Sequence, residues 1–383
     1  MTASVDPVRL AQDLIRIPSV TPVDEGAMDV VQAHLERLGF ACRRMPFDGI
    51  ENLYARRGAA GPNLCFAGHT DVVETGPVQA WRHPPFEAVI EDGVLYGRGA
   101  ADMKGCIAAW IAALDGVLSR GEPKGSLSLL ITGDEEGRAI HGTKAVVQAL
   151  IDEGEVIDAC VVGEPSSVHE LGDTIKIGRR GSLNAWIAVK GKQGHVAYPE
   201  RAANPAPVLV KLLDELDSHR LDYGYPEFPP SNLEITSIDI GNPAMNVIPE
   251  SARGQLNIRF NPSHTGESLM AWIRERCEAA QAASGRVVTV EFLHSGDAFL
   301  TERGAFVEAV QNAVEAVTGR RPEPSTTGGT SDARFITRMA PVLELGLVGQ
   351  TIHQIDEHVP VREIIDLARV YERVIEEYFE RMR

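Results

Sequence analysis

Cysteine is scarce in this sequence, and basic residues are fewer than acidic ones. The five cysteines are scattered and never form a C-x-x-C pair, which argues against a redox role for them. Lysine and arginine total 37 against 54 aspartates and glutamates, giving a formal net charge of −17. Because nucleic acids and anionic membrane surfaces repel negative charge, we expect neither as a partner.

Long apolar runs are also absent. No run approaches the ~20 residues that a membrane span needs, and residues 1–6 lack the basic region and the apolar stretch of a signal peptide. We therefore expect a cytoplasmic protein. Its 44% hydrophobic and 24% charged residues are typical of a soluble globular protein. A length of 383 residues suggests two domains.

Helical and extended patterns alternate up to about residue 179. Short apolar runs at residues 64–67, 127–132 and 159–162 are typical of buried parallel strands. The helices expected in this part cover residues 8–15, 24–38, 106–118 and 145–151. This alternation predicts an α/β fold with a doubly wound, mainly parallel sheet.

The pattern changes after residue 179. The segment 180–293 predicts an inserted α+β domain with helices on one face of its sheet. Its expected strands are residues 183–189, 232–239, 255–260 and 287–293, and its expected helices are residues 204–216 and 267–283. The first pattern then returns, with helices at 304–318 and 363–382 and a strand at 342–347. The catalytic domain is therefore expected to be discontinuous, with residues 1–179 and 294–383.

Side chains that can bind metal follow several of the expected strands. His69 follows strand 64–67, Glu135 and Glu136 follow strand 127–132, and Glu164 follows strand 159–162. Asp102 lies in a glycine-rich turn before helix 106–118, and His353 lies beyond strand 342–347. Ligands of open parallel sheets bind outside the carboxyl ends of the strands. Taken singly, Glu164 is more simply a loop carboxylate or a helix cap, and His69 is as readily a core histidine as a ligand. Together, these residues suit two zinc ions that share a bridging aspartate.

Roles can be suggested for two carboxylates at these strand ends, Asp71 and Glu135. Asp71, two residues beyond His69, can accept the other N–H of the imidazole and fix its tautomer, or it can be a turn residue at the strand end. Adjacent side chains diverge, so one of Glu135 and Glu136 can bind metal while the other faces a water molecule. We assign the general base to Glu135, although two neighbouring carboxylates can also be a solvated surface pair.

These stretches resemble motifs of the dinuclear zinc amidohydrolase/exopeptidase superfamily, which includes aminoacylase, acetylornithine deacetylase and carboxypeptidase G. The resemblance covers essentially the whole chain, including the inserted domain. Within the superfamily, the motifs are most similar to those of the succinyl-diaminopimelate desuccinylases. The segments that carry this similarity are residues 97–105 (Gly-Arg-Gly-Ala-Ala-Asp-Met-Lys-Gly), 175–182 (Ile-Lys-Ile-Gly-Arg-Arg-Gly-Ser), 328–335 (Gly-Gly-Thr-Ser-Asp-Ala-Arg-Phe) and 351–353 (Thr-Ile-His).

The resemblance implies a ligand set and catalytic roles. Each subunit would bind two zinc ions, for which cobalt can substitute. The first zinc would be held by His69, Asp102 and Glu164, and the second by Asp102, Glu136 and His353. Glu135 would be the general base and Asp71 the residue that orients His69. The peptide bond between Asp102 and Met103 would be cis.

The resemblance also implies substrate contacts from the inserted domain. His195 would reach into the partner subunit of a homodimer and stabilise the oxyanion, although a histidine at a strand end needs no such role. The expected substrate-binding residues are Arg179, Ser182, Tyr198, Asn246, Arg259, Gly329 and Thr330. Arginine suits carboxylates because its planar fork binds them bidentately, but Arg259 can also be a surface strand residue and Asn246 a turn residue. One departure is Gly349-Gln350, where close relatives often have Asn-Ala, so the resemblance does not carry over any substrate contact at these two positions.

The implied activity is hydrolysis of the amide of N-succinyl-LL-2,6-diaminopimelate to succinate and LL-2,6-diaminopimelate, which feeds lysine and cell-wall synthesis. The alternative within the superfamily is another N-acyl amino-acid deacylase, of the acetylornithine deacetylase kind, or a dipeptidase. A non-catalytic metal-binding protein on this fold is the alternative from another class. That alternative is disfavoured because neither a ligand nor the base is missing.

Overall fold

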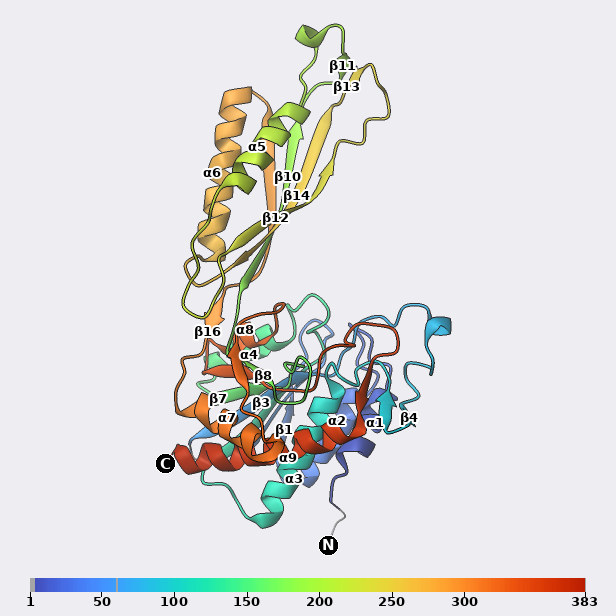
Figure 1. Ribbon diagram of the computed structural model, residues 1–383, viewed down its shortest axis with the longest axis vertical. Coiled ribbons are helices and arrows are strands. Elements are labelled where there is room, and N and C mark those ends of the chain that lie inside the picture. The colour runs from blue at the N-terminus through green and yellow to red at the C-terminus, as the bar shows by residue number, and fades with distance from the viewer. Residues whose placement is uncertain (1–3, 60, 383) are drawn as a thin grey trace. The chain divides into compact units, whose positions relative to one another are not determined.

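The computed structural model describes residues 4–59 and 61–382, which form two compact units (Figure 1). The first unit contains the described residues up to Ile177, Thr301–Ser325 and residues 331–382. The second contains Gly178–Leu300 and Thr326–Thr330. The inserted segment expected at 180–293 lies within the second unit, which also includes a short later stretch that the sequence pattern did not indicate. The first three residues of the segment examined for a signal peptide lie outside the described residues.

The first unit is built on an eight-stranded mixed sheet. Its strand order is β1 (Ala41–Arg44), β2 (Asn52–Arg57), β6 (Ser126–Thr132), β3 (Asn63–His69), β7 (Ala159–Val162), β18 (Val342–Glu344), β8 (Thr174–Lys176) and β17 (Glu323–Ser325). The four strands from β6 to β18 are parallel neighbours, whereas β2 and β8 run antiparallel to them. Every residue of β3 and β6 is buried, as expected for parallel strands covered on both faces. The prediction of an α/β fold is confirmed.

Helices of the first unit pack on this sheet. A layer of four contains α1 (Pro7–Ile15), α3 (Lys104–Arg120), α7 (Ala305–Thr318) and α9 (Val361–Arg381), which contact one another (Figure 1). The other helices are α2 (Ala27–Arg37), α4 (Thr143–Asp152), α8 (Ala333–Ile336) and the short η1 (Val78–Ala80). An aromatic stack joins the layers: the ring of Trp110 in α3 lies 4.6 Å from Phe66 in β3 and 5.0 Å from Tyr371 in α9.

The position of α3 matters for the site. The helix is buried on nearly all sides over residues 104–114, which is typical of a core helix. Its first residue, Lys104, donates a backbone hydrogen bond to the Gly99 carbonyl at 2.9 Å, closing the turn that carries Asp102. The strand β5 (Val94–Tyr96) ends where this turn begins, and it is held in a small three-stranded sheet with β4 (Val89–Glu91) and β19 (His358–Pro360). The core therefore fixes the chain just before and just after Asp102.

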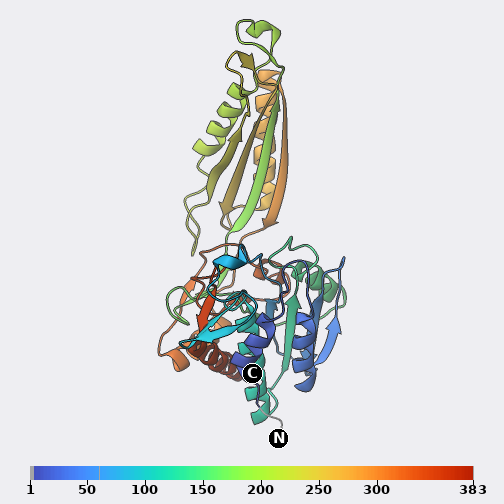
Figure 2. The same ribbon diagram turned by 90° about the vertical axis from the view of Figure 1, so that its right-hand side faces the viewer.

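The second unit is an antiparallel sheet with two helices on one face (Figures 1 and 2). The strand order is β12 (Asn232–Asp239), β14 (Ser251–Phe260), β10 (Gly181–Lys190) and β15 (Val287–Gly296), and the helices are α5 (Ala206–Ser218) and α6 (Gly266–Ser284). Alternate residues of β14 are buried, which is typical of a sheet with one covered face. Smaller elements are β9 (Gly178–Arg179), β16 (Phe299–Leu300), β11 (Gly194–His195), β13 (Val247–Ile248) and η2 (Pro199–Arg201).

The ends of α6 follow ordinary capping rules. Thr265 accepts the Ser268 N–H while Ser268 bonds back to the Thr265 N–H, so α6 begins with a reciprocal cap. It ends at Gly285, which has φ +66° and suits the left-handed conformation there. Among the helices within residues 4–59 and 61–382, none has the length and apolarity to cross a membrane.

Candidate dinuclear metal centre

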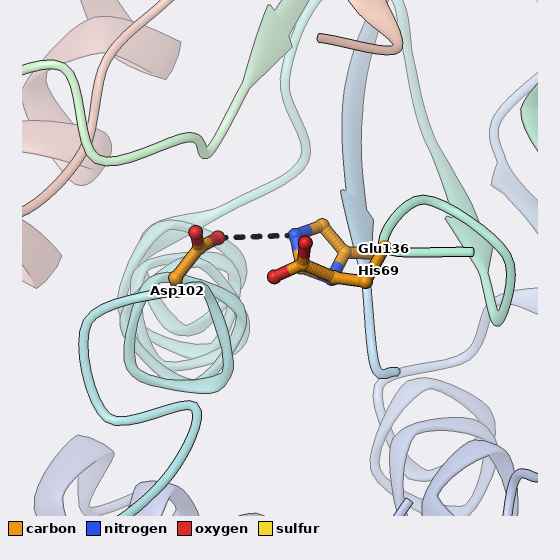
Figure 3. A group of neighbouring side chains, drawn as sticks. All are labelled: His69, Asp102 and Glu136. Atoms are coloured by element: carbon orange, nitrogen blue, oxygen red, sulfur yellow. Dashed lines mark hydrogen bonds and ion pairs between the residues drawn. The ribbon is translucent and has the colours of Figure 1, made fainter. Parts of the chain in front are cut away.

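His69 and Asp102 meet at the carboxyl end of the parallel strands. His69 is the last residue of β3, and Thr132, the last residue of β6, lies beside it. The Asp102 Oδ1 lies 3.1 Å from the His69 Nε2, and Figure 3 shows Glu136 beside this pair. Both partners are almost completely buried. Parallel strands bring the loops that follow them to one edge of the sheet. His69 reaches this edge from β3, and Asp102 reaches it from the turn that precedes α3.

Asp102 also faces a second imidazole with its other oxygen. The Asp102 Oδ2 lies 3.3 Å from the His353 Nε2, which in turn lies 2.8 Å from the Glu136 Oε1. The side chain of His353 is about half exposed. A carboxylate whose two oxygens address two different imidazoles has the geometry of a bridging ligand.

Glu164 and Glu135 complete the cluster. The Glu164 Oε1 lies 3.6 Å from the His69 Nε2. Two groups of potential ligand atoms each lie within 4.8 Å of one another: His69, Asp102 and Glu136, and His69, Glu135 and Glu164. The sequence placed Glu136 with His353 rather than with His69, and it did not count Glu135 as a ligand. By distance Glu136 neighbours both histidines, so the six predicted side chains form one continuous cluster.

The charges of this cluster are strongly coupled. Burial, and then the neighbouring Glu164, hold the pKa of Glu135 well above its usual range. Burial alone would raise the pKa of Asp102, but hydrogen bonds from His353 and His69 outweigh it and lower that pKa. Hydrogen bonds to Asp102 and Glu136 raise the pKa of His353 to about 10. Protons on the imidazoles thus balance the buried carboxylates.

Divalent cations fit this donor set. Imidazole nitrogens and carboxylate oxygens are ordinary zinc ligands, and an aspartate that offers one oxygen to each side can serve two ions. Cations would replace the protons that now neutralise the cluster. The residues that would hold them are His69, Asp102, Glu136, Glu164 and His353, with Glu135 adjacent.

We expected the side chain of Asp71 to accept the second N–H of His69, but its backbone carbonyl lies closer to that ring. The His69 Nδ1 lies 2.8 Å from the backbone carbonyl of Asp71 and 3.6 Å from its Oδ1. The carboxylate instead accepts the backbone N–H groups of Glu135 at 3.2 Å and Glu136 at 3.0 Å. Burial raises the pKa of Asp71 to about 6. Asp71 therefore orients His69 through its main chain and the Glu135–Glu136 turn through its side chain.

Sequence reasoning missed other buried groups around the cluster. Asp134 accepts the N–H groups of Arg138, Ile140 and His141, which shapes the turn after Glu136. Glu357 and Arg98 form a buried ion pair beside the Asp102 turn, with 2.7 Å between the Glu357 Oε2 and the Arg98 Nη1. A carboxylate just beyond His353 was the available signal, but loop carboxylates are too common for it to stand out. The predicted cis peptide bond between Asp102 and Met103 is confirmed.

The predicted substrate residues all belong to the second unit and form two groups. In the first, the Arg179 Nη1 donates to the Thr327 carbonyl at 3.0 Å, beside the segment of Gly329 and Thr330. Ser182 of β10 is paired with Arg259 of β14. The Arg259 Nε donates to the Asn257 Oδ1 at 3.1 Å. Burial, and then the neighbouring Arg180, lower the pKa of Arg259.

The second group lies around the β11–β13 pair. His195 is paired with Val247, next to Asn246, and its ring lies 5.8 Å from that of Tyr198. The two groups lie toward opposite ends of β10, which runs from Gly181 to Lys190 (Figure 1). At ~3.3 Å per residue, they are separated by roughly 30 Å of strand.

Gln350 occupies the position at which the resemblance led us to expect a departure. The side chain is exposed, and its Nε2 donates to the Val168 carbonyl at 2.9 Å. It also lies 3.3 Å from the His169 Nδ1.

Comparison with known proteins gives the family. The model of peptidase family M20/M25/M40 matches residues 65–377. This chain belongs to that family. A succinyl-diaminopimelate desuccinylase from Caulobacter sp. (strain K31) is 63% identical over 377 residues, which cover 98% of this chain and 97% of the relative. The resemblance to the desuccinylases predicted from the motifs is confirmed.

Solved structures of the family share the fold. An M20 family metallo-carboxypeptidase from Sulfolobus solfataricus has a TM-score of 0.79 at 17% identity, covering 98% of this chain and 99% of that one. A dinuclear metal-binding peptidase of the M20 family from Bacillus subtilis has a TM-score of 0.74 at 16% identity, covering 98% of each chain. At these identities the likeness establishes the fold of the chain.

Metal binding should release protons. His353, with a pKa of about 10 in the metal-free protein, is charged at pH 7.5 but must be neutral to bind zinc. Because its pKa is raised, zinc affinity should increase as the pH rises towards 10. Calorimetric zinc titrations in buffers of different ionisation enthalpy should give heats that vary with the buffer. The His353→Ala variant should release about one proton fewer, whereas heats independent of the buffer in both proteins would contradict this charge assignment.

Proposed function

We propose that this protein hydrolyses the amide of N-succinyl-LL-2,6-diaminopimelate with the help of two zinc ions. The name of the relative that is 63% identical over nearly the whole chain supports the substrate. The observation that carries the chemistry is Asp102, whose two oxygens face His69 and His353 at 3.1 and 3.3 Å. The dinuclear site of the Bacillus subtilis peptidase with the same fold is consistent with this number of ions.

The residues of the cluster have distinct roles in this proposal. His69, Asp102 and Glu164 hold one ion, and Asp102, Glu136 and His353 hold the other. When bound, the ions would polarise the amide carbonyl and acidify water at the site. Glu135 accepts the proton of the attacking water and delivers it to the departing amine. Burial, and then the neighbouring Glu164, raise the pKa of Glu135, which favours delivery of the proton to the departing amine.

Substrate recognition falls to the second unit. Arg179 and Arg259 present guanidinium groups that can bind substrate carboxylates bidentately. Ser182, Gly329 and Thr330 would contribute polar contacts from the same group. A protein with a net charge of −17 needs such local positive charge to hold a substrate with several carboxylates.

The separation of the two groups of substrate residues supports a homodimer. The group of Ser182 and Arg259 is separated from His195 and Asn246 by roughly 30 Å of β10. One N-acyl amino acid is too small to touch both groups of a single chain. We therefore propose that His195, with Tyr198 and Asn246, completes the site of the partner subunit and that His195 stabilises the oxyanion.

Further features belong to the same proposal. Cobalt can substitute for zinc, because imidazole and carboxylate ligands accept both metals. Production of LL-2,6-diaminopimelate places the enzyme in diaminopimelate and lysine biosynthesis. We also propose a cytoplasmic location, which is consistent with five cysteines that all carry free thiols.

Turnover of acyl substrates tests the reaction. The zinc-loaded protein should hydrolyse N-succinyl-LL-2,6-diaminopimelate much faster than N-acetylornithine, measured as steady-state kcat/KM. Glu135→Gln should lower kcat by roughly 100- to 10,000-fold, since it removes proton transfer and keeps the shape of the side chain. The exposed Glu153→Gln is the matched control and should leave kcat unchanged. Preference for the acetyl substrate would keep the hydrolase and overturn the substrate assignment.

Mixing inactive subunits tests the shared site. Glu135→Ala and His195→Ala homodimers should both be nearly inactive. In a heterodimer, one site combines the Glu135 of one chain with the His195 of the other. An equimolar, randomly exchanged mixture should therefore recover roughly a quarter of wild-type turnover. Mass spectrometry would verify the heterodimers, and their complete inactivity would contradict a contribution of His195 across the interface.

A further inference from the structure

Glu357 is a buried carboxylate that the mechanism does not use. It lies four residues after His353 and immediately before β19, and its side chain is 0% exposed. Its backbone carbonyl accepts the Gly97 N–H at 2.9 Å, which places it at the start of the glycine-rich turn. A buried carboxylate needs hydrogen bonds and a counter-ion to remain ionised. The groups that contact the Glu357 carboxylate therefore indicate its role.

The carboxylate of Glu357 binds the main chain of the turn that carries Asp102. Its Oε1 accepts the N–H groups of Ala101 at 3.0 Å and of Asp102 at 3.1 Å. Its Oε2 accepts the Gly99 N–H at 3.2 Å and the Arg98 Nη1 at 2.7 Å. Three backbone amides of one turn therefore converge on a single carboxylate, and one of them belongs to Asp102.

Arg98 supplies the counter-charge and is itself held on several sides. Its guanidinium lies 5.3 Å from the centre of the Trp81 ring, and its Nη2 donates to the Glu74 carbonyl at 3.2 Å. Only 2% of the Arg98 side chain is exposed. The ion pair thus forms a rigid support under the turn, and it is neutral overall beside a cluster already rich in carboxylates.

The segment 353–357 therefore contacts both the side chain and the backbone of Asp102. His353 faces the Asp102 Oδ2, while Glu357 binds the Asp102 N–H. We infer that Glu357, supported by Arg98, is a positioning residue that holds the bridging carboxylate of Asp102 where both metal ions can share it. This inference rests on the proposed dinuclear site and adds the group that sets its geometry.

Replacing the carboxylate by an amide tests the inference without a change in size. In Glu357→Gln, the new NH₂ group would face N–H donors instead of accepting them. Both ions should bind about 10- to 100-fold more weakly, the usual effect of losing a group that orients a ligand. The readouts are Co²⁺ titration followed by the visible absorption band, which reports ligand geometry, and calorimetric Zn²⁺ affinity.

Asp222→Asn is the matched control. Asp222 is a partly buried carboxylate that also accepts backbone N–H groups, from Gly224 at 2.7 Å and Ser231 at 3.2 Å, but it belongs to the second unit. This variant should lower the melting temperature and leave both metal affinities and the cobalt spectrum unchanged. A purely structural role for Glu357 would give the same pattern in Glu357→Gln and would overturn the inference.

A second variant covers the case in which Glu357→Gln does not fold. Arg98→Lys keeps the charge but loses the fork that joins Glu357 to the Glu74 carbonyl. It should weaken metal binding in the same direction, by about 3- to 10-fold, a smaller effect than loss of the carboxylate itself. Wild-type affinities and spectrum in folded Arg98→Lys would overturn the inference. If the wild-type protein itself bound no second ion, the proposed function would fail instead.

Discussion

The site depends on holding several carboxylates together in a buried space. Asp102, Glu135 and Glu164 would repel one another, and the protein opposes this with imidazoles that lie 3.1 and 3.3 Å from the two oxygens of Asp102. Other buried carboxylates fix the turns that carry these groups. Asp71 binds the amides of the Glu135–Glu136 turn and Glu357 those of the Asp102 turn. Hydrogen bonds from amides to ionised acceptors are stronger than neutral ones. The carboxylates of Asp71 and Glu357 therefore hold the two turns that carry the predicted ligands in place.

The fold explains why these supporting hydrogen bonds are needed. Parallel strands deliver His69, the Glu135–Glu136 turn and Glu164 to one edge of the sheet, but each arrives on a separate loop. Asp102 is placed instead by the buried start of α3, and His353 by a segment tied to β5 through β19. The side chains of five separate segments must therefore be held at fixed distances from one another, and no helix or strand connects these segments directly. Contacts between backbone amides and buried carboxylates provide this arrangement, and cations would then neutralise the cluster.

Much of the fold could be predicted because its strands are continuous apolar runs and its helices are periodic. Some of the strands that were missed carry weak signals: β1 is half exposed along its length, and β8 and β17 have three residues each. The six-residue strand β2 was missed as well. The clustered ligands could be predicted from strand ends and from the resemblance. The supporting contacts could not, because Glu357 binds an amide that lies 255 residues away in the sequence. The orienting contact to His69 was also expected from the Asp71 side chain, whereas the main-chain carbonyl of that residue lies closer.

Zinc stoichiometry tests the central role of Asp102 most directly. After equilibrium dialysis at a fixed free zinc concentration, elemental analysis of the wild-type protein should give two ions per chain, as the proposed ligand sets require. Asp102→Ala should lose both ions, because each site contains this carboxylate, whereas Glu164→Ala should retain the ion held by Glu136 and His353. Retention of one full equivalent of zinc by Asp102→Ala would contradict a shared bridging ligand.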